Sequence, residues 1–534
     1  MAQDPLSEKK VAMHDNKENS QIADDCETTT RKSVSIDRIL EHIGQLGPFQ
    51  LKVMVIYSLV LIVPAYQALI TVFINVSPSW RRSQNNHSEC NNTNIYESTD
   101  EKRCRMNRGS WEYVTPKSFS LVTQFDLVCD KDAFSHIASS GLFIGQMIGA
   151  IMFGWLADRY GRKKIMFSCL FCLCVVSFIS SFSPNIWWFT AMRVLSGFFH
   201  GGIVVPLMVL SVELVGPRYR GFVGLVTWNS WTIALCFMSL QSWYVPEWRK
   251  LTMLLSIPYL FVPIIGAIWT PESVRWYRSQ HMLLEAEKIL RKVAQVNKKV
   301  YPAVARLEPI IKKNSSDASY KDLFCTIRRS WRTLSFCLMW FTNDAVYYGV
   351  SMAASDFGGN LHRDFVLMSL IEIPVNLSTI YIINKIGRKK GAITGYIVTS
   401  TSLILFGCFL AFNIAANIYI RIAIGLIGKA FGLVSWCACE IWSAELYPTN
   451  IRSHALGLLY VLSQMGASSS PWISQWMKKF HVAIPSFTIG GLALLSCVLA
   501  TTLPETKNIE ISDTAEINKD SVVDEDEVTM TTVI

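Results

Sequence analysis

Two acidic residues lie inside long apolar runs of this sequence and are its strongest candidates for chemistry. Asp344 is thirteen residues past the start of an apolar run at 331, and Glu372 is ten residues past the start of the next at 362. At about 1.5 Å per helical residue, both lie near the middle of a bilayer. A carboxylate at that depth is costly and more often functional than decorative. We expect both to attract a cationic group. The alternative is an ion pair that serves packing, with three possible partners: Arg193, Arg421 and Lys429.

Aromatic residues in the apolar runs could present ring faces to an ammonium group. The candidates are Trp228, Trp231, Tyr347, Tyr348 and Trp436. Tyr348 follows Asp344 by four residues, so the two share a helix face. A lone aromatic residue in a membrane span usually packs or faces lipid, which is the alternative for each of the five.

Membrane helices are the elements that must position these residues. Of the 534 residues, 51% are hydrophobic and 17% charged, whereas a soluble domain has about a quarter charged residues. Apolar runs long enough to cross a bilayer recur through most of the chain, which predicts an all-α membrane protein with about twelve transmembrane helices. The predicted spans are 51–76, 135–157, 165–184, 187–212, 222–244, 250–270, 331–353, 362–384, 391–412, 415–440, 452–477 and 482–503.

Four short motifs occur twice, in the same order and about 230 residues apart, which indicates a duplicated unit. The first pair is DRYGRKK at Asp158–Lys164 and NKIGRKK at Asn384–Lys390, and the second is RVLSG at Arg193 and RIAIG at Arg421. In the third pair, Glu213 comes seven residues before Arg220, and Glu445 comes seven residues before Arg452. The fourth pair is PES at Pro271 and PET at Pro504. The repeat predicts two pseudo-symmetric halves of six helices each. Secondary transporters have this architecture and bind solute between the halves near the bilayer midplane.

Composition divides the chain into five regions: 1–50, 51–270, 271–330, 331–503 and 504–534. The first is polar, shows no signal peptide, and is expected in the cytosol. The second and fourth are the six-helix halves, and the third is a cytosolic linker whose apolar periodicity predicts amphipathic helices. The last contains Asp524-Glu525-Asp526-Glu527 and is expected to be a disordered acidic cytosolic tail.

Basic residues cluster in loops that an even number of spans places on one side of the membrane. The positive-inside rule makes that side cytoplasmic, with both termini there. The net charge of +9 is therefore explained mostly by the orientation of the chain in the membrane, and we expect no nucleic-acid partner. The clustered residues are Arg159, Arg162, Lys163 and Lys164, then Arg218 and Arg220, then Lys385, Arg388, Lys389 and Lys390.

Residues 77–134 form the one large loop predicted on the opposite side. Asn86 and Asn91 begin Asn-x-Ser/Thr patterns, which predict glycosylation outside the cell. Cys90, Cys104 and Cys129 are disulfide candidates in this oxidising compartment. Because three is an odd number, one thiol is left free or pairs elsewhere.

Motifs for enzyme chemistry are missing from the sequence. It contains no Gly-x-x-x-x-Gly-Lys-Ser/Thr phosphate loop, no His-Glu-x-x-His, and no Cys-x-x-Cys pair with metal spacing outside a span. We therefore expect no enzyme activity, cofactor, metal or ATP. Uphill transport would draw on an ion gradient or on the membrane potential, worth about 2.3 kcal/mol per 100 mV for a monovalent cation.

Several motifs resemble those of one transporter family. Gly154–Lys164 (GWLADRYGRKK) resembles the signature loop between spans two and three of the major facilitator superfamily. Other segments look like solute carrier family 22, the organic cation, anion and zwitterion transporters: Ile36–Gln50, Ser120–Asp130, Pro271–Trp276, Gly358–Leu361, Ile371–Pro374 and Glu445–Gly457. The resemblance covers about 36–507 and implies an alternating-access carrier with a glycosylated first loop in the plasma membrane.

The resemblance also implies gating roles for residues in the repeated loops. In the family, such contacts latch the outward-facing state, so we expect Glu213 to act with Arg220, and Glu445 with Arg452. The alternative is that these residues only anchor loops. In the signature loop, Asp158 and Arg162 are the residues expected to act in gating. In the same loop, Gly154 is expected to permit close helix approach, and Gly161 is expected to permit a tight turn. Asn384 replaces Asp158 in the second half, which predicts a weaker second latch.

Four positions in the spans bear on the substrate. Trp228 aligns with an aromatic residue in a substrate-contacting stretch of the family. Gln464 stands where cation-transporting relatives typically carry Asp and where anion- and carnitine-type relatives typically carry Arg, so this neutral residue favours neither group. Asn376 stands where anion carriers tend to have Lys. Asp344 departs from the small polar residue that is common in the family.

We interpret the chain as a carrier of small organic ions, with cations or zwitterions such as amine-, choline- or carnitine-like compounds preferred. The predicted binding residues are Asp344, Glu372, Trp228, Tyr348 and Gln464. The alternatives are an organic anion exchanger, in which a buried Arg or Lys faces solute, a sugar porter on the same fold, and a membrane receptor that does not transport. Intact motifs in both halves argue against the receptor.

Overall fold

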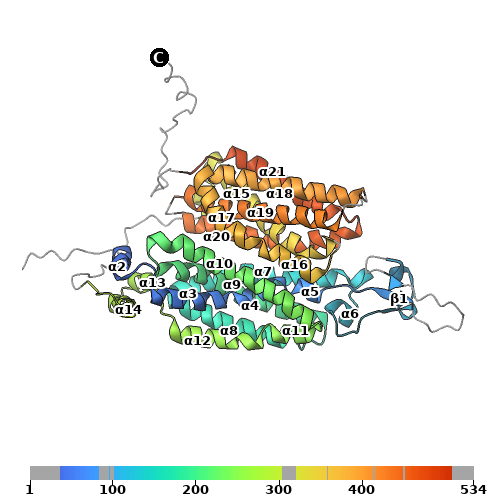
Figure 1. The fold of residues 1–534 in the computed structure, drawn as a ribbon, viewed down its shortest axis with the longest axis horizontal. Coiled ribbons are helices and arrows are strands. Elements are labelled where there is room, and N and C mark those ends of the chain that lie inside the picture. The colour runs from blue at the N-terminus through green and yellow to red at the C-terminus, as the bar shows by residue number, and fades with distance from the viewer. Residues whose placement is uncertain are drawn as a thin grey trace, which may run out of the picture.

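The computed structural model describes residues 36–82, 95–96, 101–302, 320–357, 359–412, 414, 417–448 and 451–507. The helices form two bundles that lie side by side, one from each half of the chain (Figure 1). The predicted tail after residue 507 and the glycosylation acceptors Asn86 and Asn91 lie outside the described residues, as does Cys90.

The first bundle contains the six predicted spans of the N-terminal half. Its helices are α3 (Pro48–Val60), α4 (Ile62–Leu69), α5 (Thr71–Ile74), α7 (Ala133–Tyr160), α8 (Arg162–Ser180), α9 (Ile186–Glu213), α10 (Arg220–Tyr244), α11 (Trp248–Leu254) and α12 (Phe261–Trp269). The first span consists of α3, α4 and α5, and the sixth of α11 and α12, because short interruptions divide them.

The second bundle contains the six predicted spans of the C-terminal half. Its helices are α15 (Ile327–Met352), α16 (Leu361–Leu370), α17 (Glu372–Ile386), α18 (Arg388–Ala411), α19 (Ile418–Leu446), α20 (Arg452–Ser474) and α21 (Ile484–Thr502). One span is divided between α16 and α17, two residues before Pro374. Proline has no backbone N–H to donate, so it is tolerated in the first turn of a helix but not in its interior.

Ten helical segments of the described chain are long and apolar enough to cross a bilayer. The two remaining spans, α15 and α20, are more polar and pack along each other. These two helices carry Asp344 and Gln464. Polar residues in a membrane bundle face its interior, so the less apolar composition of α15 and α20 follows from their inner position. The chain is thus a multi-pass all-α membrane protein.

The two ends of the double bundle differ. One end, which we call the loop end, carries the segment between α5 and α7, with α6 (Leu121–Phe125) and a three-stranded antiparallel sheet in the order β2-β1-β3 (Figure 1). Its strands are β1 (Trp80–Arg82), β2 (Ile95–Tyr96) and β3 (Trp111–Tyr113). The opposite end, the linker end, carries α2 (Ile36–Ile43), α13 (Val274–Ser279) and α14 (Leu283–Val296).

Helices α7 and α9 approach each other at small residues. A methyl group on Gly145 would lie 2.0 Å from the backbone oxygen of Val194, and one on Gly149 would lie 1.9 Å from that of Phe198. Such spacing brings two membrane helices into backbone contact. The expected close approach at Gly154 is wrong, since a methyl group there would meet nothing within 4 Å. The close contacts lie five and nine residues earlier on α7, at Gly149 and Gly145.

Candidate functional site

Glu372 lies at the start of α17 in a buried ion pair between helices of the second bundle. Its Oε1 lies 2.9 Å from Nζ of Lys429 on α19, and the two residues are 3% and 2% exposed. Its Oε2 accepts hydrogen bonds from Thr232 of α10 at 2.8 Å and from the Tyr347 hydroxyl at 3.4 Å. Of the three cations considered from the sequence, Lys429 is the partner.

The five aromatic residues considered from the sequence form one connected cluster. Trp231 donates from Nε1 to the Tyr347 hydroxyl at 2.9 Å, and its ring centroid lies 6.1 Å from that of Trp228. The Tyr347 ring lies 5.1 Å from Tyr348 and 5.4 Å from Trp436. The tryptophans of α10 belong to one half and the other three residues to the opposite half, so the aromatic cluster bridges the halves.

Lys429 already makes the kind of contact that an organic cation would make with this cluster. Its ammonium nitrogen lies 5.1 Å from the centroid of the Tyr347 ring. A cation at that distance is attracted by the ring quadrupole. The arrangement therefore shows that the aromatic cluster can hold a positive charge beside Glu372.

Asp344 lies in a different environment on α15. It is 1% exposed, its Oδ2 accepts a hydrogen bond from the Ser463 hydroxyl of α20, and its Oδ1 has no hydrogen-bond partner. No ion pair between Asp344 and a Lys, Arg or His occurs in the part of the chain that the structure describes. Gln464, next to Ser463, is also buried, with its Oε1 unpartnered.

Sequence reasoning missed a third acidic residue in a span. Glu440 lies on α19, one turn after Trp436 and on the same side of the helix. Glu440 is exposed in the structure and lies close enough to Asp344 for the two charges to interact. The signal was present in the sequence, but the predicted span ended at residue 440 whereas α19 continues to Leu446, so Glu440 looked like a boundary residue.

At the linker end of the first bundle, Arg162 joins α8 to the end of α9. Its Nη1 donates to Oε1 of Glu213 at 2.5 Å, and Ser273 donates its hydroxyl to the other oxygen of Glu213. Asp158 lies 3.4 Å from Arg162 with its side chain 73% exposed. The expected pairing of Glu213 with Arg220 is wrong, because Arg220 pairs with Asp37 of α2 instead.

The second bundle repeats this network. Arg388 donates from Nε and Nη2 to both oxygens of Glu445 at 2.8–3.1 Å, and Thr506 donates to the same carboxylate at 2.7 Å. The expected pairing of Glu445 with Arg452 is wrong, since Arg452 donates to the backbone oxygen of Tyr447. The weaker second latch expected from Asn384 stays a prediction, and the Arg388–Glu445 pair itself is made through two nitrogens of Arg388.

Two further acidic residues, which sequence reasoning did not single out, cap the helices that follow the repeated glycines. Glu272 accepts from the backbone N–H of Lys163 at 2.9 Å, and Glu505 accepts from those of Arg388 and Lys389 at 3.0 and 3.1 Å. Carboxylates favour helix N-termini. Their signal was the repeated PES and PET, which place one acidic residue after each half.

The turn glycines make room for these caps. Gly161 and Gly387 have φ of +110° and +99°, which confirms the tight turn predicted at Gly161. A methyl group on either would lie 2.5 or 2.4 Å from the capping carboxylate of Glu272 or Glu505. Glycine is thus required here both by its backbone conformation and by the space that the carboxylate occupies.

The halves contact each other from the loop end to the level of Glu372. Near the loop end, Lys479 lies 2.9 Å from Asp132, and Trp472 donates to Ser140 at 3.0 Å. Deeper in the bundle, Gln146 of α7 donates to the Tyr460 hydroxyl of α20 at 2.9 Å. On the other side of the interface, hydrogen bonds join α10 to α16 and α17: Ser239 and Ser242 to His362, Thr232 to Glu372, and Asn376 to Asn229.

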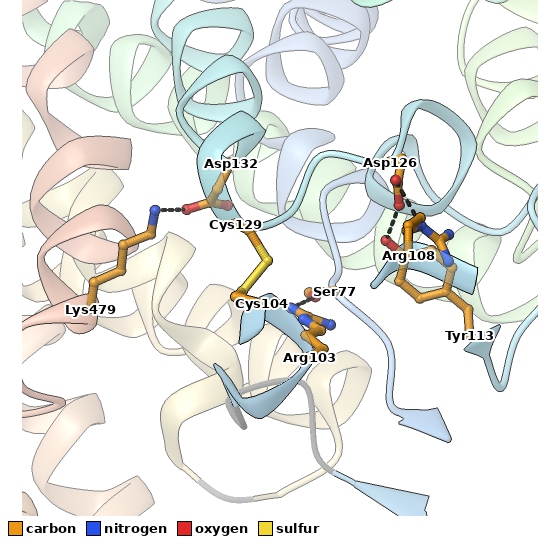
Figure 2. Close-up of a disulfide and its surroundings, with 9 residues drawn as sticks. All are labelled: Ser77, Arg103, Cys104, Arg108, Tyr113, Asp126, Cys129, Asp132 and Lys479. Atoms are coloured by element: carbon orange, nitrogen blue, oxygen red, sulfur yellow. Dashed lines mark hydrogen bonds and ion pairs between the residues drawn. A yellow bond between two sulfur atoms is a disulfide. The ribbon is translucent and has the colours of Figure 1, made fainter. Parts of the chain in front are cut away.

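The loop before α7 is tied to this interface by a disulfide between Cys104 and Cys129, three residues before Asp132 (Figure 2). In the same loop, Asp126 accepts from Arg108 at 2.8 Å and from the Tyr113 hydroxyl at 2.9 Å. Burial opposes the ionisation of Asp126, but these hydrogen bonds outweigh it and lower its pKa. The loop is therefore built around a charged carboxylate as well as a covalent link.

Comparison with known proteins identifies the family. A family model described as "Sugar (and other) transporter" matches residues 102–517. The chain belongs to this family of the major facilitator superfamily. Solute carrier family 22 member 7 of Rattus norvegicus is 26% identical, over 92% of this chain and 100% of the rat protein. The organic cation/carnitine transporter 4 of Arabidopsis thaliana is 28% identical, over 91% of this chain and 92% of the plant protein.

Solved structures show the same fold. A partially occluded, inward-open structure of the xylose transporter XylE from E. coli has a TM-score of 0.62 at 15% identity, covering 87% of this chain and 100% of XylE. The major facilitator fold and the resemblance to solute carrier family 22 are thereby confirmed. The chain is a transporter of the solute carrier family 22 type rather than an enzyme, and its substrates are small molecules.

Proposed function

We propose that this transporter carries small organic cations or zwitterions by alternating access, and that they bind between the halves at the aromatic cluster. The observation that carries the proposal is Asp344, a buried carboxylate without a cationic partner in the described chain. A buried charge is stable only when it is paired. The aromatic cluster reaches Asp344 through Tyr348 of the same helix face, so a substrate ammonium can contact both.

The ion pair of Glu372 with Lys429 supports zwitterions as well as cations. A substrate carrying both an ammonium and a carboxylate can exchange partners with such a pair without leaving either charge unpaired. The Arabidopsis relative, whose name gives organic cations and carnitine, points to the same substrates.

The organic anion alternative depends on a basic residue that faces substrate. Lys429 is the basic residue at this site, and its charge is neutralised by Glu372. Arg193 is buried within the first bundle, where its Nη1 donates to the backbone oxygen of Gln67 at 2.8 Å. An anion would have to displace Glu372 from Lys429, and the released carboxylate would then remain buried without its cationic partner. A cation needs no such step.

Contacts between the halves support a gating model in which the loop end is closed in this structure. We assign the loop end to the extracellular side and the linker end to the cytosol of a plasma-membrane protein, with both termini cytosolic. Asn86 and Asn91 would then be glycosylated. Asp158, Arg162, Glu213, Arg220, Glu445 and Arg452 would keep the cytoplasmic helix ends of each half together as the halves move.

Uptake of labelled organic ions in cells that express the chain tests the proposal. We expect tetraethylammonium or carnitine to enter faster than in control cells, and p-aminohippurate not to. Asp344→Asn should lower uptake by about tenfold or more, equivalent to about 1.4 kcal/mol. Glu285→Gln on the exposed surface of α14 removes one charge without touching the site and should leave uptake unchanged. Uptake of p-aminohippurate that persists in Asp344→Asn and Glu372→Gln would establish the anion alternative instead.

A further inference from the structure

The second oxygen of Asp344 is the least satisfied charged atom at the binding site. Ser463 donates to Oδ2, and Oδ1 has no partner although the residue is 1% exposed. Glu372, at the same site, has an ammonium, a threonine hydroxyl and a tyrosine hydroxyl around its carboxylate. An ionised Asp344 would therefore lack the compensation that the same site provides for Glu372.

The groups around Asp344 provide no positive charge from the elements that pack against it. Its own helix α15 contributes the phenol of Tyr348, α20 contributes Ser463 and the phenol of Tyr460, and α19 contributes the carboxylate of Glu440. Helix α21 faces α15 through a hydrogen bond between Ser496 and Thr342. These groups are neutral or acidic, so a negative charge on Asp344 is opposed by its surroundings.

We propose that Asp344 binds a proton when no substrate is present, and that the transporter exchanges protons for organic cations. The proton and the substrate ammonium satisfy the same carboxylate and exclude each other. Binding of the cation releases the proton from Oδ1, and departure of the cation lets one return. This inference rests on the proposed function, because it assigns the coupling ion of the same site.

Glu440 offers a route from the linker end for the proton that returns to Asp344 after the cation departs. Glu440 is exposed in the structure, whereas Asp344 is buried, and the two carboxylates are close enough to interact through space. It lies closer than Trp436 to the end of α19 at Leu446, beside the Glu445 network. A carboxylate at this position can accept and pass on a proton without forming a permanent partner for Asp344.

Charge balance makes the exchange distinct from uptake driven by the membrane potential. One proton leaves for each monovalent cation that enters, so no net charge crosses the membrane. A proton gradient of one pH unit then supports up to about tenfold accumulation of the cation, equivalent to about 1.4 kcal/mol. Potential-driven uptake would instead move one positive charge per cation.

The test uses the purified full chain in liposomes that contain a pH-sensitive dye, with tetraethylammonium as the probe. Adding tetraethylammonium outside should raise the luminal pH, and an acidic lumen should increase its accumulation by up to about tenfold per pH unit. Asp344→Asn should abolish both effects. Asp344→Glu should retain them, and Glu440→Gln should slow the pH change while leaving tetraethylammonium binding at equilibrium intact.

A binding measurement keeps the proposal testable if a variant transports poorly. The affinity of the purified wild-type protein for tetraethylammonium should fall as pH falls, because protons compete for Asp344. Tetraethylammonium uptake without luminal alkalinisation and with pH-independent affinity would overturn proton exchange and leave the proposed function standing. Uptake of p-aminohippurate in place of tetraethylammonium would overturn both.

Discussion

The linker ends of the two halves show the same network built twice from different residues. In each half, the arginine after the turn glycine pairs with a glutamate at the end of another helix, namely Glu213 or Glu445. A hydroxyl from Ser273 or Thr506 donates to that glutamate in each half. Since both halves retain these parts although their sequences have diverged, the arginine–glutamate pair and its hydroxyl form the core of the network.

The halves differ in what surrounds this core. In the first half, Asp37 of α2 pairs with Arg220 and with Arg275 of α13, so the N-terminal segment and the linker join the network. In the second half, Arg452 bonds to the backbone of its own turn. The first network therefore links two segments outside the bundle, α2 and α13, to the bundle helices, whereas the second involves no such segment in the described chain.

The largest effect should come from removing a core glutamate. Glu213→Gln leaves Arg162 without its main partner, and we expect a loss of about 2 kcal/mol of stability, because charged hydrogen bonds that are partly buried contribute this much. Glu445→Gln should cost slightly less, since the side chain of Glu445 is 23% exposed against 9% for Glu213. Thermal unfolding of the purified variants measures both. Equal melting temperatures for wild type and Glu213→Gln would show that the pair is not the core.

The capping glutamates should contribute less and equally in the two halves. Glu272→Gln and Glu505→Gln each weaken one charged cap, with an expected cost of about 1 kcal/mol. Because the two caps lie in different halves, the double variant should show the sum of the two effects. The melting temperatures of the two single variants and the double variant decide this. A loss of stability in only one of the two single variants would show that the two caps are not equivalent.

Asp37→Asn tests the difference between the halves. It should cost about 0.5 kcal/mol, because the pairs of Asp37 are partly exposed and screened by solvent. It should also increase proteolytic cleavage between α12 and α14, since Arg275 of α13 loses its partner. Glu285→Gln on exposed α14 serves as the control. Identical cleavage in Asp37→Asn and wild type would mean that α2 does not hold the linker.

Composition and repeats predicted the fold because the bilayer dictates helix length and the duplication dictates the halves. The ion-pair partners could not be predicted in the same way. Glu213 and Arg220 are seven residues apart, two turns on one helix, but α9 ends at Glu213 and the chain turns before α10 begins at Arg220. Their side chains therefore belong to different helices.

The candidate binding site was partly predictable. Acidic and aromatic residues were found because their types are unusual in apolar helices. The partner of Glu372 was not, because three cations were available. Lys429 is selected because α17 and α19 are neighbours, whereas Arg193 belongs to the other half and Arg421 lies near the start of α19. Such pairs are decided by the depth of each residue in the membrane and by which helices are neighbours, and the local sequence specifies neither.

The smallest effect is expected where the sequences of the two networks differ most visibly. Asp158 and Asn384 occupy matching positions, and their difference suggested unequal latches. However, the side chain of Asp158 is 73% exposed and lies 3.4 Å from Arg162, which Glu213 already engages at 2.5 Å. Surface pairs of this kind contribute little, so Asp158→Asn and Asn384→Asp should each change stability by less than about 0.5 kcal/mol.

Uptake separates stability from gating in these two variants. If Asp158 acts only as a loop charge, both variants should transport at wild-type rates. Asp158→Asn with normal stability but slower uptake would show that this carboxylate acts in a conformation in which it meets a partner other than Arg162. In that case this asymmetry between the halves would lie in the transport cycle, because the core arginine–glutamate contacts of the two networks are the same in kind.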